Sequence, residues 1–108
     1  MRCKKCTLKF IHKFERNVAR DAVVRQLVRS GTSIGGNHRA SRRARSRAEF
    51  IARLGIVVEA ADETEEWLTL LRDSELSEGA ELEWLSNEAT EFRRIFAASL
   101  RTARRNGR

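Results

Sequence analysis

The chain contains no proline, so no residue in it forces a helix to break. Tyrosine is also absent and only 6 of the 108 residues are glycine, so a sandwich or barrel would lack the turn residues that it needs. Long uninterrupted helices are therefore the expected architecture. A chain of 108 residues can bury one modest core but not two, and we expect a single all-α domain over residues 1–108.

The segment from Ser46 to Arg72 has the clearest helical pattern. Ser46-Arg47-Ala48-Glu49 has the spacing of a capping box. In such a box the hydroxyl accepts from a free backbone amide of the first turn, and the carboxylate accepts from the backbone amide of the cap residue. Apolar or small residues then alternate in steps of four and three, at Phe50, Leu54, Val57, Ala61, Thr64, Leu68 and Leu71. This spacing predicts a helix over residues 46–72 with a seam for neighbouring helices.

Three other helices are expected around this one. Residues 77–105 repeat the near-heptad pattern, with Ser77 as a candidate N-cap. Residues 17–41 place Val23, Leu27 and Ile34 on one face, and residues 1–16 hold a basic leader with about two turns of apolar pattern. Because short links make neighbours antiparallel, the sequence predicts an antiparallel up-down four-helix bundle with a shortened first helix.

Three glycines lie within the expected second helix, at Gly31, Gly35 and Gly36. Each lowers helix stability by about 1 kcal/mol relative to alanine. Close approach of a neighbouring helix is the usual reason to keep such glycines. Otherwise the helix kinks or stops there.

Charge is segregated along the chain, which has a net charge of +7 and a pI near 10.7. Residues 1–53 hold 15 Lys/Arg against 3 acids, residues 54–92 hold 1 against 12, and residues 93–108 hold 6 against none. Such blocks can pair helix with helix, pair subunit with subunit, or leave a basic face free for nucleic acid. The sequence alone leaves these three alternatives open.

The densest basic cluster lies at the junction of the expected second and third helices. It consists of Arg39, Arg42, Arg43, Arg45 and Arg47. Guanidinium groups donate paired hydrogen bonds to phosphate oxygens. The amides at the start of the third helix add the positive end of a helix dipole. We therefore take these five arginines as candidate nucleic-acid contacts. No aromatic residue is interleaved, so base stacking is not indicated.

Two plainer interpretations of this cluster remain open. The side chains can form a solvated loop, or they can pair with the acidic run from Glu59 to Glu66 of a neighbouring subunit. The C-terminal arginines, Arg101, Arg104, Arg105 and Arg108, either extend the basic surface or form a frayed and solvated end.

No metal or cofactor site can be drawn from the sequence. Cys3 and Cys6 have the spacing of half a zinc site, and His12 could be a third ligand, but the second pair that a structural zinc needs is missing. The carboxylates between Glu59 and Glu63 lack the Glu-x-x-His pairs of metal sites in helical bundles.

Catalysis and a membrane location are not expected either. No nucleophile or carboxylate is placed with His38 by any known spacing, so we expect a protein that is not an enzyme. No apolar run is long enough to cross a bilayer or to form a secretory signal, so the chain is interpreted as cytoplasmic.

Two motifs, in this order, resemble a known family. Ser33-Ile34-Gly35-Gly36-Asn37 ends the expected second helix, and Glu49-Phe50-Ile51 opens the third. They are similar to the marks of the bacterial four-helix bundle proteins encoded in 23S ribosomal RNA intervening sequences. This resemblance implies an up-down bundle, assembly into rings of five subunits, and no established catalytic activity. A related branch, the accessory variability determinants of diversity-generating retroelements, implies a reverse transcriptase partner and a basic surface that binds nucleic acid.

The chain departs from this family pattern at its first helix, which is short, and after Asn37, where His38-Arg39-Ala40-Ser41 replaces the usual small or acidic residue. An incomplete first helix would expose apolar surface and favour oligomerisation. Our leading hypothesis is a non-enzymatic homo-oligomer that binds RNA or DNA through the arginine cluster. The alternative is a protein-interaction scaffold or adaptor that makes no contact with nucleic acid.

Overall fold

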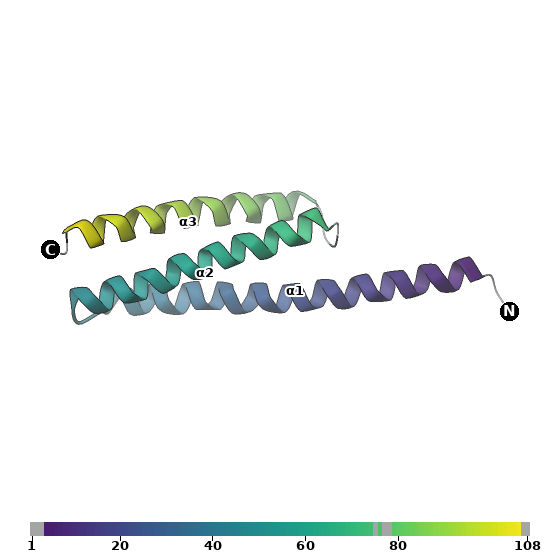
Figure 1. Cartoon of the computed structure of the whole chain (residues 1–108), viewed down its shortest axis with the longest axis horizontal. Helices are drawn as coiled ribbons and strands as arrows, with labels where there is room; N and C mark the ends of the chain where they lie inside the picture. The colour runs from purple at the N-terminus through teal and green to yellow at the C-terminus, as the bar shows by residue number, and fades with distance from the viewer. Residues whose placement is uncertain (1–3, 75, 77–78, 107–108) are drawn as a thin grey trace.

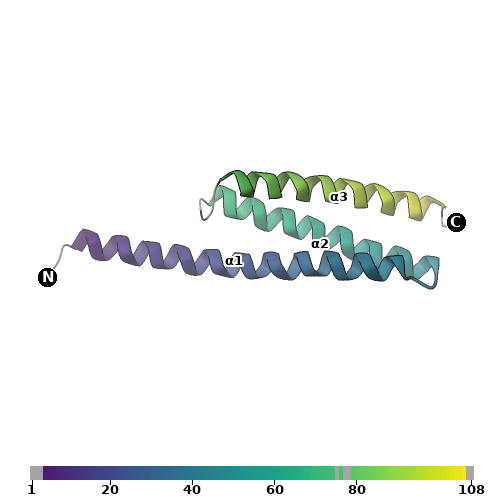
Figure 2. The same cartoon turned by 180° about the vertical axis from the view of Figure 1, so that it is seen from behind.

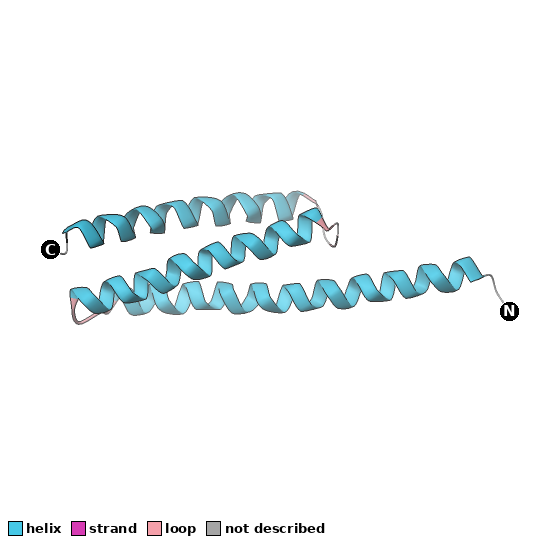
Figure 3. Cartoon of the chain, viewed as in Figure 1, coloured by secondary structure: helices cyan, strands magenta, loops and turns pink. Residues whose placement is uncertain are grey.

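The computed structural model describes residues 4–74, 76 and 79–106, with side chains from Lys13 onward. Over these residues the chain forms three helices and no strand: α1 (Lys4–Arg42), α2 (Arg47–Asp73) and α3 (Ala80–Asn106) (Figures 1 and 3). The all-α expectation is therefore confirmed. Successive helices run antiparallel, and α2 lies between α1 and α3 in both opposite views (Figures 1 and 2).

The N-terminal half of the fold differs from the expectation. We expected a short first helix (1–16) and a second helix (17–41), but from Lys4 onward these residues lie in one continuous helix, α1. The part of the chain that the structure describes thus has three helices, and the four-helix bundle is not confirmed. The physical reason is the absence of a stop signal near residue 16, because the chain has no proline and its first glycine is Gly31.

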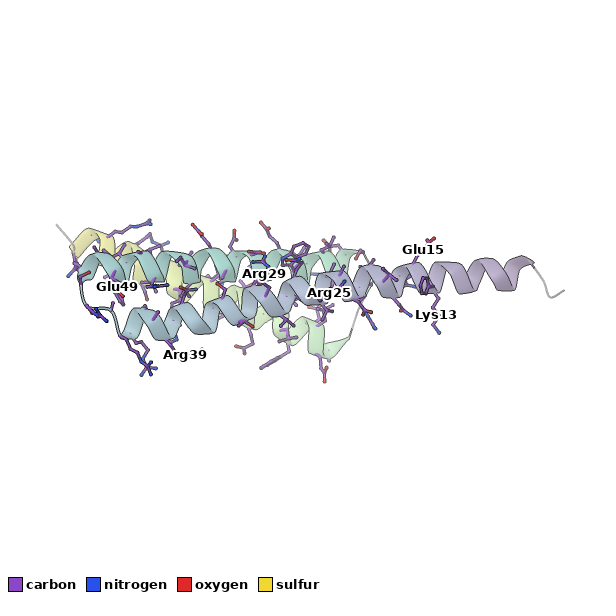
Figure 4. The ribbon with its side chains drawn as sticks, turned by 90° about the horizontal axis from the view of Figure 1, so that it is seen from below. Lys13, Glu15, Arg25, Arg29, Arg39 and Glu49 are labelled. Carbon is purple, nitrogen blue, oxygen red and sulfur yellow. The ribbon has the colours of Figure 1, made fainter. Side chains whose placement is uncertain are left out.

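The first part of α1 extends past the other two helices (Figures 1 and 4). Val23 is the first buried residue among the described side chains, and it belongs to one cluster with Leu68 and Leu71, which lie toward the end of α2. Every described side chain before Val23 is exposed. We call residues 4–20 the α1 extension, and it is about 25 Å long at the usual rise per residue.

The link between α1 and α2 is tight and capped. The amides of Arg43 and Ala44 donate to the carbonyls of Ala40 and Ser41, at 3.2 Å each, which closes α1 with short turns. Ser46 is the N-cap of α2, as the sequence predicted, and its Oγ accepts from the amide of Glu49 at 3.1 Å. This capped link fixes where the arginine cluster lies.

The link between α2 and α3 ends at a glycine in a left-handed conformation. Gly79 has a φ of 123° and directly precedes the first residue of α3, and its carbonyl accepts from the amide of Glu83 at 3.2 Å. Only glycine adopts this φ without steric cost. Ser77, the expected N-cap, lies outside the described residues.

The core is built around α2, because α2 contacts both other helices. One buried cluster joins Val23 of α1, Leu68 and Leu71 of α2, and Leu82 of α3. Toward the other end of α2, the buried residues are Leu54, Val57, Ala60 and Ala61. Leu54, Val57, Ala61, Leu68 and Leu71 all belong to the predicted seam, so the expected periodicity of this helix is confirmed.

Candidate nucleic-acid interface

The structure brings all five candidate arginines to one end of the molecule. Arg39 and Arg42 lie in the last turn of α1, Arg43 and Arg45 lie in the link, and Arg47 is the first residue of α2. All five side chains are exposed. The labelled Arg39 points away from α2 (Figure 4). The capped link thus presents five guanidinium groups on a short stretch of surface.

No acidic side chain of the described part forms an ion pair with any of these five arginines. The ion pairs that do form involve other arginines: Arg20 with Asp21, Arg29 with Glu63, Arg72 with Asp73, and Arg93 with Glu65. Within the described chain, the five guanidinium groups are therefore not engaged in ion pairs. Arg39 and Arg42 do lie near the carbonyl end of α1, where cations are favoured by the helix dipole.

Two backbone amides near the start of α2 already have side-chain partners. Glu49 is partly buried, and its Oε2 accepts from the amide of Arg45 at 3.3 Å, while its own amide is held by Ser46. The carboxylate of Glu49 also lines a shallow polar hollow together with Arg39, Arg43 and Arg45. Guanidinium groups of three arginines and one carboxylate therefore surround this hollow.

The C-terminal turn of α3 lies beside the cluster. Nη2 of Arg47 donates to the carbonyl of Ala103 at 3.4 Å. Because α3 stays helical to Asn106, this contact extends the basic surface with three more exposed arginines, Arg101, Arg104 and Arg105. Arg108 lies outside the described residues. We call the eight exposed arginines at this end the basic pole: Arg39, Arg42, Arg43, Arg45, Arg47, Arg101, Arg104 and Arg105.

The acidic run of α2 is partly used to join the helices. Glu63 pairs with Arg29 of α1, and Glu65 accepts from Nε of Arg93 of α3 at 2.9 Å. Helix-to-helix pairing therefore accounts for part of the charge segregation. It does not involve the basic pole.

The chain matches a family model described as 23S rRNA-intervening sequence protein, over residues 1–98. The chain belongs to this family. Its fold is also similar to the crystal structure of a protein with unknown function from the S23 ribosomal protein family of Bacteroides thetaiotaomicron VPI-5482. That protein is 39% identical over 73% of this chain and 70% of its own, with a TM-score of 0.68. No curated protein matches the chain.

The Ser-Ile-x-x-Asn motif, which resembles a mark of the family, has a structural role in this chain. Nδ2 of Asn37 donates to the carbonyl of Ser33 at 3.0 Å, and Oδ1 of Asn37 accepts from Nη1 of Arg53 at 3.2 Å. The motif thus ties the end of α1 to α2. It therefore supports the helix ends that bear the arginine cluster, and none of its own residues belongs to that cluster.

Sequence reasoning missed one surface of this family member. An apolar groove lies over α2, lined by Ile34, Ala61, Thr64, Leu68, Leu85, Glu88, Ala89 and Phe92. The glycines of α1, which called for a close neighbour, do not line this groove. Among the described residues, no side chain approaches the position that a Cβ would take on Gly31 or Gly36.

The remaining expectations concern metals and membranes. The described residues hold no group of three His, Cys, Asp or Glu that is placed to bind a metal ion. Cys3 and the side chains of Cys6 and His12 lie outside the described part. Within that part, no helix is both long and apolar enough to span a membrane.

Proposed function

We propose that this chain is a non-enzymatic protein that binds RNA or DNA through the phosphates, and that it does so as a homo-oligomer. The observation behind the proposal is the group of five exposed arginines at the α1–α2 link, none of which has a carboxylate partner in the described chain. The nearby C-terminal turn of α3 adds three arginines of the same sign.

The physical argument is one of counterion release. Each phosphate neutralised by an arginine frees condensed cations, so affinity falls as salt rises, with a slope of about 0.9 per phosphate on duplex DNA. Phosphate contacts position a protein on the nucleic acid but do not distinguish one base sequence from another. We therefore expect similar affinities for nucleic acids of unrelated sequence and equal length.

The test is fluorescence anisotropy with an RNA hairpin and a DNA duplex, across a series of salt concentrations. Arg42→Ala/Arg43→Ala removes two charges from the basic pole, and Arg25→Ala/Arg94→Ala removes two exposed charges elsewhere as a matched control. The first variant is expected to lower the salt slope by roughly two relative to wild type, and the control by less than one. Equal losses in both variants, or affinity that ignores salt, would contradict the proposal.

A second candidate is an adaptor for a protein partner such as a reverse transcriptase, without contact to nucleic acid. The apolar groove and the exposed Trp84 favour a protein partner. Glu66 is exposed, whereas Glu65 is bonded to Arg93, so Glu66→Lys tests intermolecular charge pairing without breaking a pair inside the chain. An adaptor of this kind would lose its partner in Glu66→Lys and keep it in the Arg42→Ala/Arg43→Ala variant.

A further inference from the structure

An open pocket lies beside the basic pole, between the start of α2 and the C-terminal part of α3. These two segments lie side by side at the end of the molecule where α1 and α2 are linked (Figures 1 and 2). The pocket has a volume of about 610 Å³, which is within the range of roughly 300–1,000 Å³ that is typical of ligand sites. We call it the Phe50 pocket, and it is lined by Arg47, Phe50, Ala98, Ser99, Thr102 and Ala103.

The Phe50 pocket exists because small side chains of α3 lie opposite a large one of α2. The four residues that α3 contributes form two pairs spaced four apart, so they lie together on one face of the helix. Phe50, which is partly buried, lines the pocket from α2. Nη2 of Arg47 donates to the carbonyl of Ala103 at 3.4 Å, so a hydrogen bond joins the two walls. The pocket therefore combines an aromatic ring, small side chains and a guanidinium group.

Arginines of the basic pole border the Phe50 pocket on both helices. Arg47 lies three residues before Phe50 in α2, and on α3 Arg105 follows Thr102 by the same spacing. Residues three apart are neighbours on the surface of a helix. Both arginines are exposed. A phosphate bound to either of them would therefore lie next to the pocket.

The chemistry of the pocket suits a nucleobase. Bases of any sequence stack on aromatic rings, because every base has a π-face. Ser99 and Thr102 are exposed and line the pocket, and their hydroxyl groups can both donate and accept hydrogen bonds at the edge of a base. The pocket depends on the return of α3 to the start of α2, so the arginine cluster in the sequence gave no indication of base stacking.

We propose that the Phe50 pocket takes up one unstacked nucleobase of a single-stranded nucleic acid, while arginines of the basic pole bind the adjoining phosphates. The base stacks on the ring of Phe50. Bases in a duplex are already paired and stacked, and none enters the pocket without being extruded at an energetic cost. This inference rests on the proposed function and names its substrate class.

Three ligands of equal length separate base binding from phosphate binding. They are a single-stranded RNA, the same RNA in a duplex, and an abasic ribose-phosphate chain, and their affinities for the full chain are measured by fluorescence anisotropy at low salt. The wild type is expected to bind the single-stranded RNA roughly tenfold more tightly than the abasic chain, since stacking of one base on an aromatic ring has about this effect. The two strands have the same number of phosphates, so the difference reports the bases.

Filling the pocket from an exposed position tests its role without removing Phe50. Ser99→Leu should weaken binding of the single-stranded RNA roughly tenfold and leave the duplex and the abasic chain unchanged. Asn87→Leu, at an exposed position of α3 outside the pocket, is the matched control and should bind all three ligands as the wild type does. Circular dichroism checks the fold of both variants.

Replacing the ring gives a direct signal of stacking. Phe50→Ala should lose the same affinity for single-stranded RNA as Ser99→Leu, whereas Phe50→Trp keeps an aromatic ring and should bind as the wild type does. In Phe50→Trp, the single-stranded RNA should quench the tryptophan fluorescence and the abasic chain should not. The change seen in the wild type, which has Trp67 and Trp84, is subtracted.

Failure of this inference and failure of the proposed function give different results. Equal affinity of the wild type for the single-stranded RNA and the abasic chain would overturn the inference and leave phosphate binding intact. Unchanged RNA binding by Ser99→Leu, or equal weakening of all three ligands, would also overturn it. If none of the three ligands binds to the wild type in a salt-dependent way, the proposed function fails and the inference fails with it.

Discussion

Oγ of Ser30 in α1 lies 2.8 Å from Oγ1 of Thr64 in α2, and Ser30 is completely buried. The Thr64 hydroxyl also donates to the carbonyl of Ala60 at 2.8 Å, so both hydroxyls have partners. A small polar residue at position 30 therefore allows α1 and α2 to approach closely. The pair also fixes the register that aligns Asn37 with Arg53 and positions the basic pole.

Replacing Ser30 by a larger apolar residue should lower the free energy of unfolding more than replacing it by alanine. Ser30→Leu should lower the free energy of unfolding by about 1–3 kcal/mol because it overpacks a closed contact. Ser30→Ala should cost only about 1 kcal/mol, since Thr64 keeps its bond to Ala60. Urea denaturation followed by circular dichroism measures both. Thr32→Ala, an exposed control on the same helix, should change little, and a Ser30→Leu variant as stable as wild type would show that the helices are not in close contact here.

The N-cap of α2 should make a measurable contribution to stability. Ser46→Ala removes the acceptor for the amide of Glu49 and should lower the free energy of unfolding by about 1 kcal/mol, while Ser46→Gly should cost only a few tenths. Ser99→Ala, at an exposed position of α3, is the control. Equal stabilities of the Ala and Gly variants would argue against a capping role.

Local signals predicted α2 and α3 well because their causes lie close together in sequence. The Ser46 cap, the seam of α2 and the C-terminal arginines of α3 depend on neighbours within one or two turns. The continuity of α1 was not predicted, because the apolar pattern before residue 17 covers only about two turns, although no proline or glycine precedes Gly31 to end a helix there. The groove could not be located either, since it depends on how three helices are placed around α2.

The arginine cluster was found from the sequence, whereas its extension by the C-terminal arginines was only one of two alternatives. The contact between Arg47 and Ala103 depends on the antiparallel return of α3, which spacing alone does not give. The same return brings Arg93 next to Glu65, so this residue of the acidic run pairs within the chain. Composition and periodicity do not show which distant segments of the chain lie next to each other.

Two glycines should respond in opposite directions to the same substitution. Gly79→Ala forces a side chain onto a φ of 123° and should lower the free energy of unfolding by about 1–2 kcal/mol. Gly55→Ala, inside α2 with no atom within 4 Å of the added Cβ, should raise it by up to about 1 kcal/mol through helix propensity. Thermal and urea unfolding measure the pair. Destabilisation by Gly55→Ala would mean that a neighbouring molecule lies against that face of α2.

The contact between Glu65 and Arg93 should have a measurable coupling energy. Their atoms are 2.9 Å apart and the side chains are only 26% and 31% exposed, so screening by water is incomplete. A double-mutant cycle with Glu65→Gln and Arg93→Gln should give a coupling of about 1 kcal/mol in low salt, decreasing as salt rises. The local pair of Arg72 and Asp73, at 3.5 Å, is the comparison and should couple less. A coupling energy near zero would mean that Glu65 does not stabilise the packing of α2 on α3. Glu65 would then be available to a partner protein, which favours the adaptor function.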